Sequence, residues 1–243
     1  MFASPHTVPN TPRRAPLIIA LPGTGSDADF ARRAFEPACV ARGFDFLAVE
    51  PDPRCVVASC RAALDAAAEG DRPVLVTGIS LGAAIALEWA AEHPGVVSGV
   101  VAALPAWTGP DTAACPAALS AAYTAAQLRA DGLEPVIERM RAGSPDWLAA
   151  ALTQSWRAQW PHLPQALAEA AEYKWPDAER LRGIATPVAV VTAVDDPVHP
   201  LAVAEEWAAL LPRAELHRIT LDELGADPAI LGHRGLGTFD ESR

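Results

Sequence analysis

Short apolar segments alternate with longer amphipathic segments along most of the chain, and this alternation is the feature that most limits its fold. The strand-like runs lie at residues 17–21, 44–50, 73–78, 96–104, 187–194 and 214–221. Nearly continuous apolar runs separated by helical patterns are typical of parallel strands that are covered on both faces. The sequence therefore predicts an α/β fold with a mostly parallel sheet of about six strands covered by helices.

The alternation stops between Trp107 and Gly183, where only helical patterns occur. An all-helical insert of this size cannot belong to the sheet, so we expect a core of residues 1–106 and 184–243 with a helical cap at 107–183. The insert contains many of the tryptophans, namely Trp107, Trp147, Trp156, Trp160 and Trp175. Tryptophans here either pack the helices together or line an apolar pocket. Trp107 is the candidate substrate-binding residue among them, because it directly follows a predicted strand.

Composition narrows the class of partner. The 243 residues are 51% hydrophobic, enough for one large core, and the net charge of −11 disfavours nucleic acid and anionic membrane surfaces. No apolar run approaches the roughly 18 residues of a membrane span, and the first residues lack the apolar core of a signal peptide. We expect a cytoplasmic protein with a small-molecule substrate, either monomeric or a homodimer. The cysteines form no C-x-x-C pair, so no metal site is predicted.

A serine between two glycines marks the most specific motif. Gly78-Ile79-Ser80-Leu81-Gly82 has the pattern G-x-S-x-G, with a strand-like run before it and a helical run after it. In that context the serine occupies a strained turn and its hydroxyl stands clear of the sheet. The N-terminus of the following helix points at the site, so the backbone N–H of Leu81 is a candidate oxyanion donor. The motif predicts a nucleophilic serine.

With this motif the chain resembles the α/β-hydrolase-fold serine hydrolases, from about Leu17 to about Gly237. The resemblance implies a catalytic triad in the chain order Ser, Asp or Glu, His. The stretch "TAVDDPVHP" at 192–200 resembles the family's acidic loop, in which an Asp lies four residues before a proline. That likeness selects Asp196 as the triad acid, with Asp195 as the alternative.

The resemblance also guides the choice of histidine. His233 lies in "ILGHRGLG", a glycine-flanked stretch expected to be a loop after the last strand, where the family's catalytic histidine belongs. We therefore predict that His233 is the base, with His217 as the fallback although it lies within a predicted strand. His199 shares the acidic loop and is expected to lie too near Asp196 to reach Ser80.

The loop after the first strand supports two interpretations. By resemblance "LPGTGSDADF" (21–30) supplies the second oxyanion donor, with the N–H of Thr24 first and that of Gly25 second, although Pro22 replaces the family's usual His. The same stretch contains G-x-G-x-x-A, and Glu50 follows where a dinucleotide-binding fold keeps its ribose-binding acid. NAD binding is therefore the rival hypothesis, but it leaves the serine motif unexplained.

The predicted activity is hydrolysis of an ester, lactone or thioester through an acyl-enzyme on Ser80, with no cofactor. Gly25 and Trp107 are the candidate substrate contacts. The alternative is a non-hydrolytic transacylase, cyclase or lyase that uses the same triad, because exclusion of water decides between these outcomes.

Overall fold

A six-stranded parallel sheet forms the centre of the computed structural model, which describes residues 15–70 and 72–240. The strand order is β2-β1-β3-β4-β5-β6. The strands are β1 (Leu17–Leu21), β2 (Asp45–Ala48), β3 (Val74–Ile79), β4 (Val97–Ala103), β5 (Val188–Ala193) and β6 (Ala214–Ile219). These bounds fall on the predicted apolar runs and confirm the predicted fold class.

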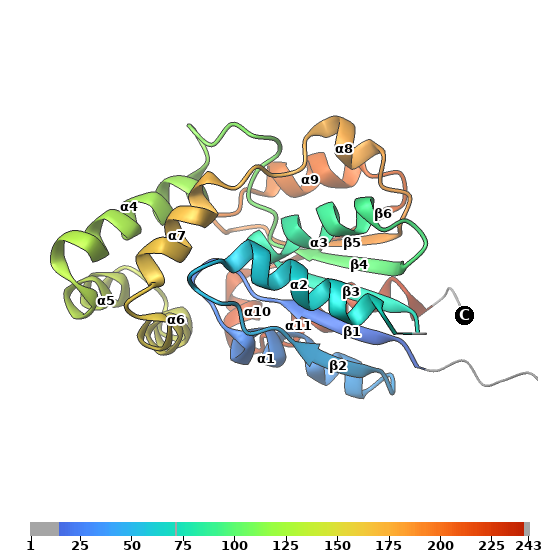
Figure 1. The fold of residues 1–243 in the computed structure, drawn as a ribbon, viewed down its shortest axis with the longest axis horizontal. Coiled ribbons are helices and arrows are strands. Elements are labelled where there is room, and N and C mark those ends of the chain that lie inside the picture. Colours follow the sequence, from blue (N-terminus) through green and yellow to red (C-terminus); the bar gives the residue numbers. More distant parts are fainter. Residues whose placement is uncertain (1–14, 71, 241–243) are drawn as a thin grey trace, which may run out of the picture.

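Helices cover both faces of the sheet (Figure 1). One face holds α2 (Val56–Ala68), α3 (Leu81–Glu92) and α9 (Leu201–Leu210), and the other holds α1 (Ala28–Val40), α10 (Leu221–Ala226) and α11 (Ile230–Gly237). Alternate residues of β1 serve the two layers, since Ile19 packs with α3 and Ile18 packs with α1. This two-sided burial explains why the strands are apolar throughout instead of alternating with polar residues.

The remaining helices lie in sequence between β4 and β5. They are α4 (Pro116–Asp131), α5 (Leu133–Ala142), α6 (Asp146–Gln159), α7 (Leu163–Glu172) and α8 (Ala178–Arg182). We refer to α4–α7 as the cap helices. Figure 1 shows them to the left of the sheet, beyond the carboxyl ends of the strands, whereas α8 lies beside α9. The cap helices have a small apolar core of their own, in which Trp156 packs with Leu163 and Leu167.

Within residues 15–70 and 72–240, none of the helices has the length and hydrophobicity that spanning a bilayer requires. The opening residues 1–14, on which the expectation of no signal peptide rests, lie outside the described residues.

Candidate active site

Ser80 occupies a strained turn between β3 and α3. Its φ of 52° and ψ of −114° lie outside the regions that non-glycine residues favour. A Cβ at Gly78 would lie 2.2 Å from the carbonyl oxygen of Gly82, and a Cβ at Gly82 would lie 2.6 Å from the carbonyl oxygen of Leu21. Both glycines of the motif are therefore required by the close approach of strand, turn and helix, and the serine sits at the apex of that turn.

His199 connects Ser80 to Asp196. The ring Nε2 of His199 lies 3.0 Å from Ser80 Oγ, and its Nδ1 lies 2.8 Å from Asp196 Oδ2. A carboxylate can only accept, so Nδ1–H donates to it and Nε2 is left to accept the serine proton. Burial shields this line of groups, since 16% of the His199 side chain and 9% of the Asp196 side chain are exposed. In this geometry the imidazole lies where a base could take the serine proton, with a carboxylate behind it.

The loop between β5 and α9 supplies both the acid and the base. Asp196 Oδ1 accepts hydrogen bonds from the backbone N–H groups of Val198, at 2.7 Å, and His199, at 3.3 Å. One carboxylate thus fixes the loop backbone with one oxygen and the imidazole with the other. Pro200 ends the loop at the start of α9.

These contacts set the charge of the acid. Burial by itself raises the pKa of Asp196, but it is outweighed by the hydrogen bond and attraction of the His199 ring together with the backbone bonds of Val198 and His199. The pKa of Asp196 therefore lies below its ordinary value, and the carboxylate is ionised at neutral pH.

A tight turn after β1 lies beside the serine. The N–H of Ser26 donates to the carbonyl of Gly23 at 3.1 Å, and Gly25 has a φ of +67°, as the third position of a type II turn requires. A Cβ at Gly23 would lie 3.6 Å from Ser80 Cβ, so the turn passes close to the hydroxyl-bearing residue. Among the described residues, none accepts a hydrogen bond from the backbone N–H of Thr24 or Gly25. We refer to Gly23–Ser26 as the β1 turn.

The comparison with protein families matches this architecture. A model of the alpha/beta hydrolase family matches residues 7–233, nearly the whole chain. The chain belongs to the alpha/beta hydrolase family. No curated protein sequence matches it.

Solved structures share this fold over most of the chain. BpoC from Mycobacterium tuberculosis is 21% identical with a TM-score of 0.69, and the match covers 95% of this chain and 94% of that one. MenH from S. aureus is 16% identical with a TM-score of 0.68, covering 96% and 91%. The enol-lactonase from Burkholderia xenovorans is 15% identical with a TM-score of 0.67, covering 85% and 83%. These likenesses establish the fold.

The histidine expectation for this alpha/beta hydrolase needs correction. His233 lies in helix α11, not in a loop, and its side chain is exposed, whereas His199, which was expected not to reach Ser80, does so. The flanking glycines serve packing, because a Cβ at Gly232 would lie 2.7 Å from the carbonyl oxygen of Ala34 and one at Gly235 would lie 2.3 Å from the side chain of Val101.

The two alternatives to these triad assignments have other partners. His217 lies in β6, where its Nε2 is 2.7 Å from Thr238 Oγ1, and burial as the main cause lowers its pKa. Asp195 is exposed and its Oδ1 accepts the N–H of Leu221 at 2.8 Å. Neither side chain takes part in the line from Asp196 to the serine.

The start of α1 bears on the rival hypothesis of NAD binding. In a dinucleotide-binding fold this helix N-terminus holds the pyrophosphate. Here Glu50 Oε2 accepts the N–H of Ala28 at 2.9 Å, and Asp27 Oδ1 accepts that of Phe30 at 2.9 Å. Two carboxylates thus accept from the N–H groups that a phosphate would need, and their negative charge would repel a phosphate. This arrangement disfavours NAD binding.

The candidate substrate contacts occupy different environments. Trp107 is 5% exposed, and its ring centroid lies 4.2 Å from that of Trp175, which in turn lies 5.7 Å from that of Trp207. This stack belongs to the core on the α3 side of the sheet. Gly25 is in contact with Trp156, since a Cβ there would lie 3.0 Å from the indole Nε1. The role of Trp107 in substrate binding stays a prediction.

We next consider the side chains that could bind a metal ion in the described part of the chain. There, no group of three or more His, Cys, Asp or Glu side chains is arranged to hold an ion. Cys39 and Cys60 are buried, and burial raises the pKa of each thiol to about 12, so neither is poised as a thiolate ligand or nucleophile.

Proposed function

We propose that this alpha/beta hydrolase is a serine hydrolase that cleaves an ester-type small molecule through an acyl-enzyme on Ser80. The observation that carries the proposal is the 3.0 Å contact between His199 Nε2 and Ser80 Oγ, with Asp196 behind the imidazole. In this assignment Ser80 is the nucleophile, His199 the general base and acid, and Asp196 the group that orients His199 and stabilises its charged form.

The reaction follows from these positions. Ser80 Oγ attacks the ester carbonyl carbon and its proton passes to His199 Nε2, while the backbone amides of Leu81 and Thr24 stabilise the oxyanion. Collapse breaks the bond to the leaving group, which takes the proton from His199. Water then attacks the acyl carbon, gives a proton to His199, and releases the acid as that proton returns to Ser80 Oγ.

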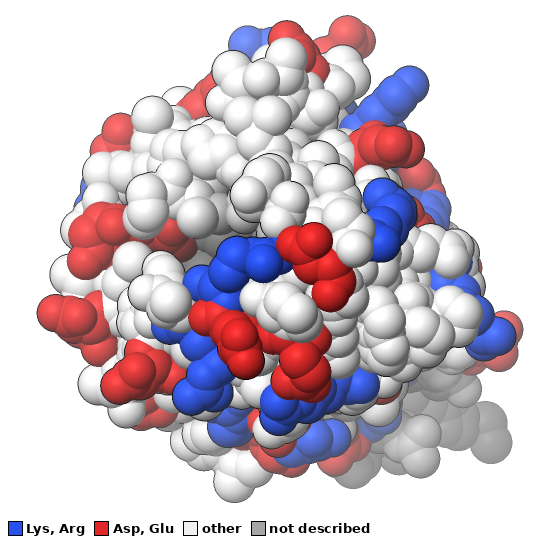
Figure 2. All heavy atoms as spheres, turned by 90° about the vertical axis from the view of Figure 1, so that its left-hand side faces the viewer, with Lys and Arg blue, Asp and Glu red and all other residues white. Residues whose placement is uncertain are grey.

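The charge pattern of the cap end supports an uncharged substrate. The cap helices carry ion pairs between their own residues, including Arg139 with Asp131 and Arg157 with Glu134. Figure 2, which looks onto the cap end, shows acidic and basic side chains mixed on this face, with a broad uncharged area above them. The mixed charges give this face no strong preference for an anion or a cation, and the net charge of −11 disfavours anionic substrates, so we assign a neutral ester or lactone.

Labelling with a fluorophosphonate probe, followed by peptide mass spectrometry, tests the nucleophile. We expect the label on Ser80, and Ser80→Ala to abolish both labelling and hydrolysis of short aryl esters. Ser98→Ala is the matched control. The Ser98 hydroxyl donates to the Val74 carbonyl at the start of β3, whereas Ser80 follows the end of that strand. Label on another residue, or full esterase activity in Ser80→Ala, contradicts the proposal. Acyl transfer to added alcohols without hydrolysis would favour the non-hydrolytic alternative.

A further inference from the structure

We propose that cap helix α6 positions the oxyanion donor of the β1 turn, so that this donor is aligned only while the cap is seated. Ser155 and Gln159 are the positioning residues. The inference rests on the proposed function, because it assigns the turn a role in holding the oxyanion.

Two side chains of α6 donate hydrogen bonds to the carbonyl groups of the turn. Ser155 Oγ lies 2.7 Å from the carbonyl oxygen of Gly25, closer than the 3.3 Å to Leu152 in its own helix. Gln159 Nε2 lies 2.8 Å from the carbonyl oxygen of Ser26. Residues four apart lie on one face of a helix, so both donors reach the turn together. Both side chains are at most 4% exposed.

Because peptide bonds are planar, fixing the carbonyl of Gly25 also restricts the orientation of the oxyanion donor. The carbonyl of Gly25 shares a rigid peptide plane with the N–H of Ser26, which donates to the carbonyl of Gly23. The Gly23 carbonyl in turn shares a plane with the N–H of Thr24. By fixing the first plane, Ser155 limits rotation of the second, and the Thr24 N–H keeps its direction.

Side-chain packing adds to the same contact. A Cβ at Gly25 would lie 3.0 Å from Trp156 Nε1 and 3.2 Å from Leu167 Cδ2, so α6 and α7 rest directly on the turn. Gln154, which precedes Ser155 in α6, donates from its Nε2 to Asp27 Oδ2 at the start of α1, over 3.3 Å. A cap that moves away breaks all of these contacts at once.

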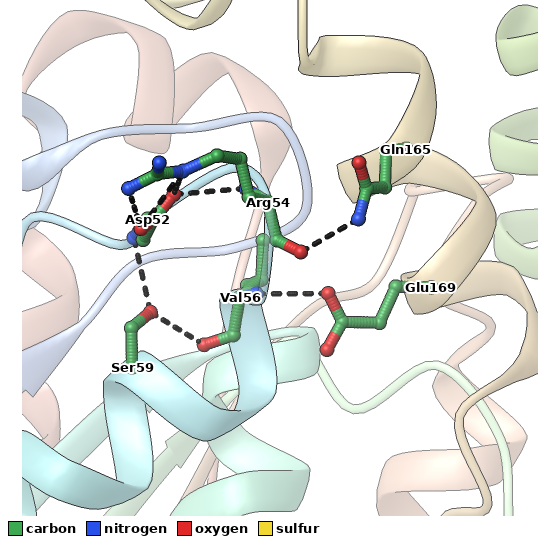
Figure 3. Close-up of polar contacts among 6 residues, drawn as sticks. All are labelled: Asp52, Arg54, Val56, Ser59, Gln165 and Glu169. Atoms are coloured by element: carbon green, nitrogen blue, oxygen red, sulfur yellow. Dashed lines mark hydrogen bonds and ion pairs between the residues drawn. The ribbon is translucent and has the colours of Figure 1, made fainter.

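A second attachment of the cap provides a control, because it involves the start of α2 and not the β1 turn. Figure 3 shows Glu169 of α7 directed at the first backbone N–H of α2, where its Oε2 lies 2.8 Å from Val56 N. Gln165, also on α7, donates to the carbonyl oxygen of Arg54 at 2.7 Å. Gln165 and Gln159 therefore make the same kind of bond from the cap to the core at different places.

The experiment compares two matched pairs of variants. Gln159→Met and Gln165→Met each delete one amide donor from the cap, but only the first acts on the β1 turn. Ser155→Ala and Thr153→Val each delete a buried hydroxyl of α6, but Thr153 Oγ1 bonds Ala149 within the helix, at 2.6 Å. The measurements are kcat and KM for an aryl ester, the thermal midpoint, and the inhibition constant of an aryl trifluoromethyl ketone. This inhibitor bonds its carbonyl carbon to Ser80 Oγ, leaving an oxyanion on the inhibitor while the serine proton passes to His199.

Loss of a whole oxyanion donor costs about 10²- to 10³-fold in kcat, so misalignment of one should cost about 10- to 100-fold. We expect Gln159→Met and Ser155→Ala to lower kcat by that factor, to raise the inhibition constant in parallel, and to leave KM within about twofold. Gln165→Met and Thr153→Val should leave kcat and the inhibition constant within about twofold. Equal effects within each pair, or a fall in thermal midpoint without a change in kcat, overturn the inference. A wild-type chain that neither hydrolyses esters nor binds the ketone overturns the proposed function instead.

Discussion

The segments after β5 and after β6 each carry a histidine, and the structure uses them in opposite ways. Residues 194–200 form a short loop in which Asp196 holds both the backbone and the ring of His199 against Ser80. Residues 230–237 form helix α11, in which Gly232 and Gly235 face inward and His233 faces outward. The proline-bounded loop is the one that delivers a side chain to the serine, and the glycine-rich segment is the one that packs.

Glycine and aspartate differ in how they shape the backbone around them, and this explains the difference between the two segments. Glycine permits unusual backbone angles, but it also lets two elements approach with no Cβ between them. In α11 the second property dominates, since the helix lies against α1 through Gly232 and against β4 through Gly235. After β5, hydrogen bonds from the backbone to Asp196 make a short loop rigid enough to orient an imidazole.

Substitutions of the two histidines should differ more in kcat than any other pair of variants. Replacing the base of a serine triad costs on the order of 10⁵- to 10⁶-fold in kcat, because the nucleophile is no longer deprotonated as it attacks. We expect His199→Ala to show a loss of this order in aryl ester hydrolysis, and His233→Ala to stay within about twofold. Equal losses in the two variants would return the role of base to His233.

The next effect separates the neighbouring acids of the loop. Asp196→Asn should lower kcat by about 10⁴-fold, because an amide can donate to Nδ1 and so stabilise the wrong tautomer of His199. Asp195→Asn is the control, since its side-chain oxygen can still accept the N–H of Leu221. Steady-state kinetics of the two variants decide this, and a greater loss in Asp195→Asn would contradict the assignment of the acid.

A third measurement concerns the glycines of α11 and the stability of the fold. A Cβ at Gly235 would lie 2.3 Å from the Val101 side chain, whereas one at Gly237 would meet nothing within 4 Å. Overpacking of a core costs about 1–3 kcal/mol, which for a chain of this size lowers the thermal midpoint by roughly 2–12 °C. We expect Gly235→Ala to show this fall and Gly237→Ala to show none. If Gly235→Ala melts like the wild type, the packing role of the glycine is wrong.

The smallest effect is the pH dependence of the loop's contribution to stability. The pKa of Asp196 is lower in the folded chain than its ordinary value of 3.8, so the ionised form favours folding. This contribution is fully present above the unfolded pKa and is lost as the pH falls through the folded pKa. Denaturant titrations should therefore show that Asp196→Asn destabilises the chain more at pH 7 than at pH 3. An equal difference at both pH values would contradict the ionic contribution.

Much of the fold and part of the site follow from local sequence patterns. Burial on both faces makes the strands continuously apolar, so their positions were predictable, and β1 falls on the predicted run at 17–21. The turn at Ser80 was predictable for a related reason, because glycines two residues on either side have few other uses between a strand and a helix. The insert between β4 and β5 was visible from the absence of strand-like runs.

His199 could not be identified in this way, although Asp196 lies only three residues before it. Proximity in sequence argues against contact between His199 and Ser80, but the bond between Asp196 Oδ2 and His199 Nδ1 leaves the other ring nitrogen facing away from the loop. The spacing D-x-x-H between a strand and a proline was the available signal. Its meaning depends on where the loop lies relative to β3.

The strands, the helices that cover them, the sharp turn at Ser80 and the acidic loop can all be identified from the sequence, because each depends on residues close together in the chain. Long-range packing, in contrast, brings His199 to the serine and brings Ser155 and Gln159 to the β1 turn. The sheet order places β4 between β3 and β5, so the loop after β5 must reach across about 10 Å, two strand spacings, to meet the turn after β3. That distance depends on strand order, which is set by packing across the whole core and leaves no trace in any local stretch.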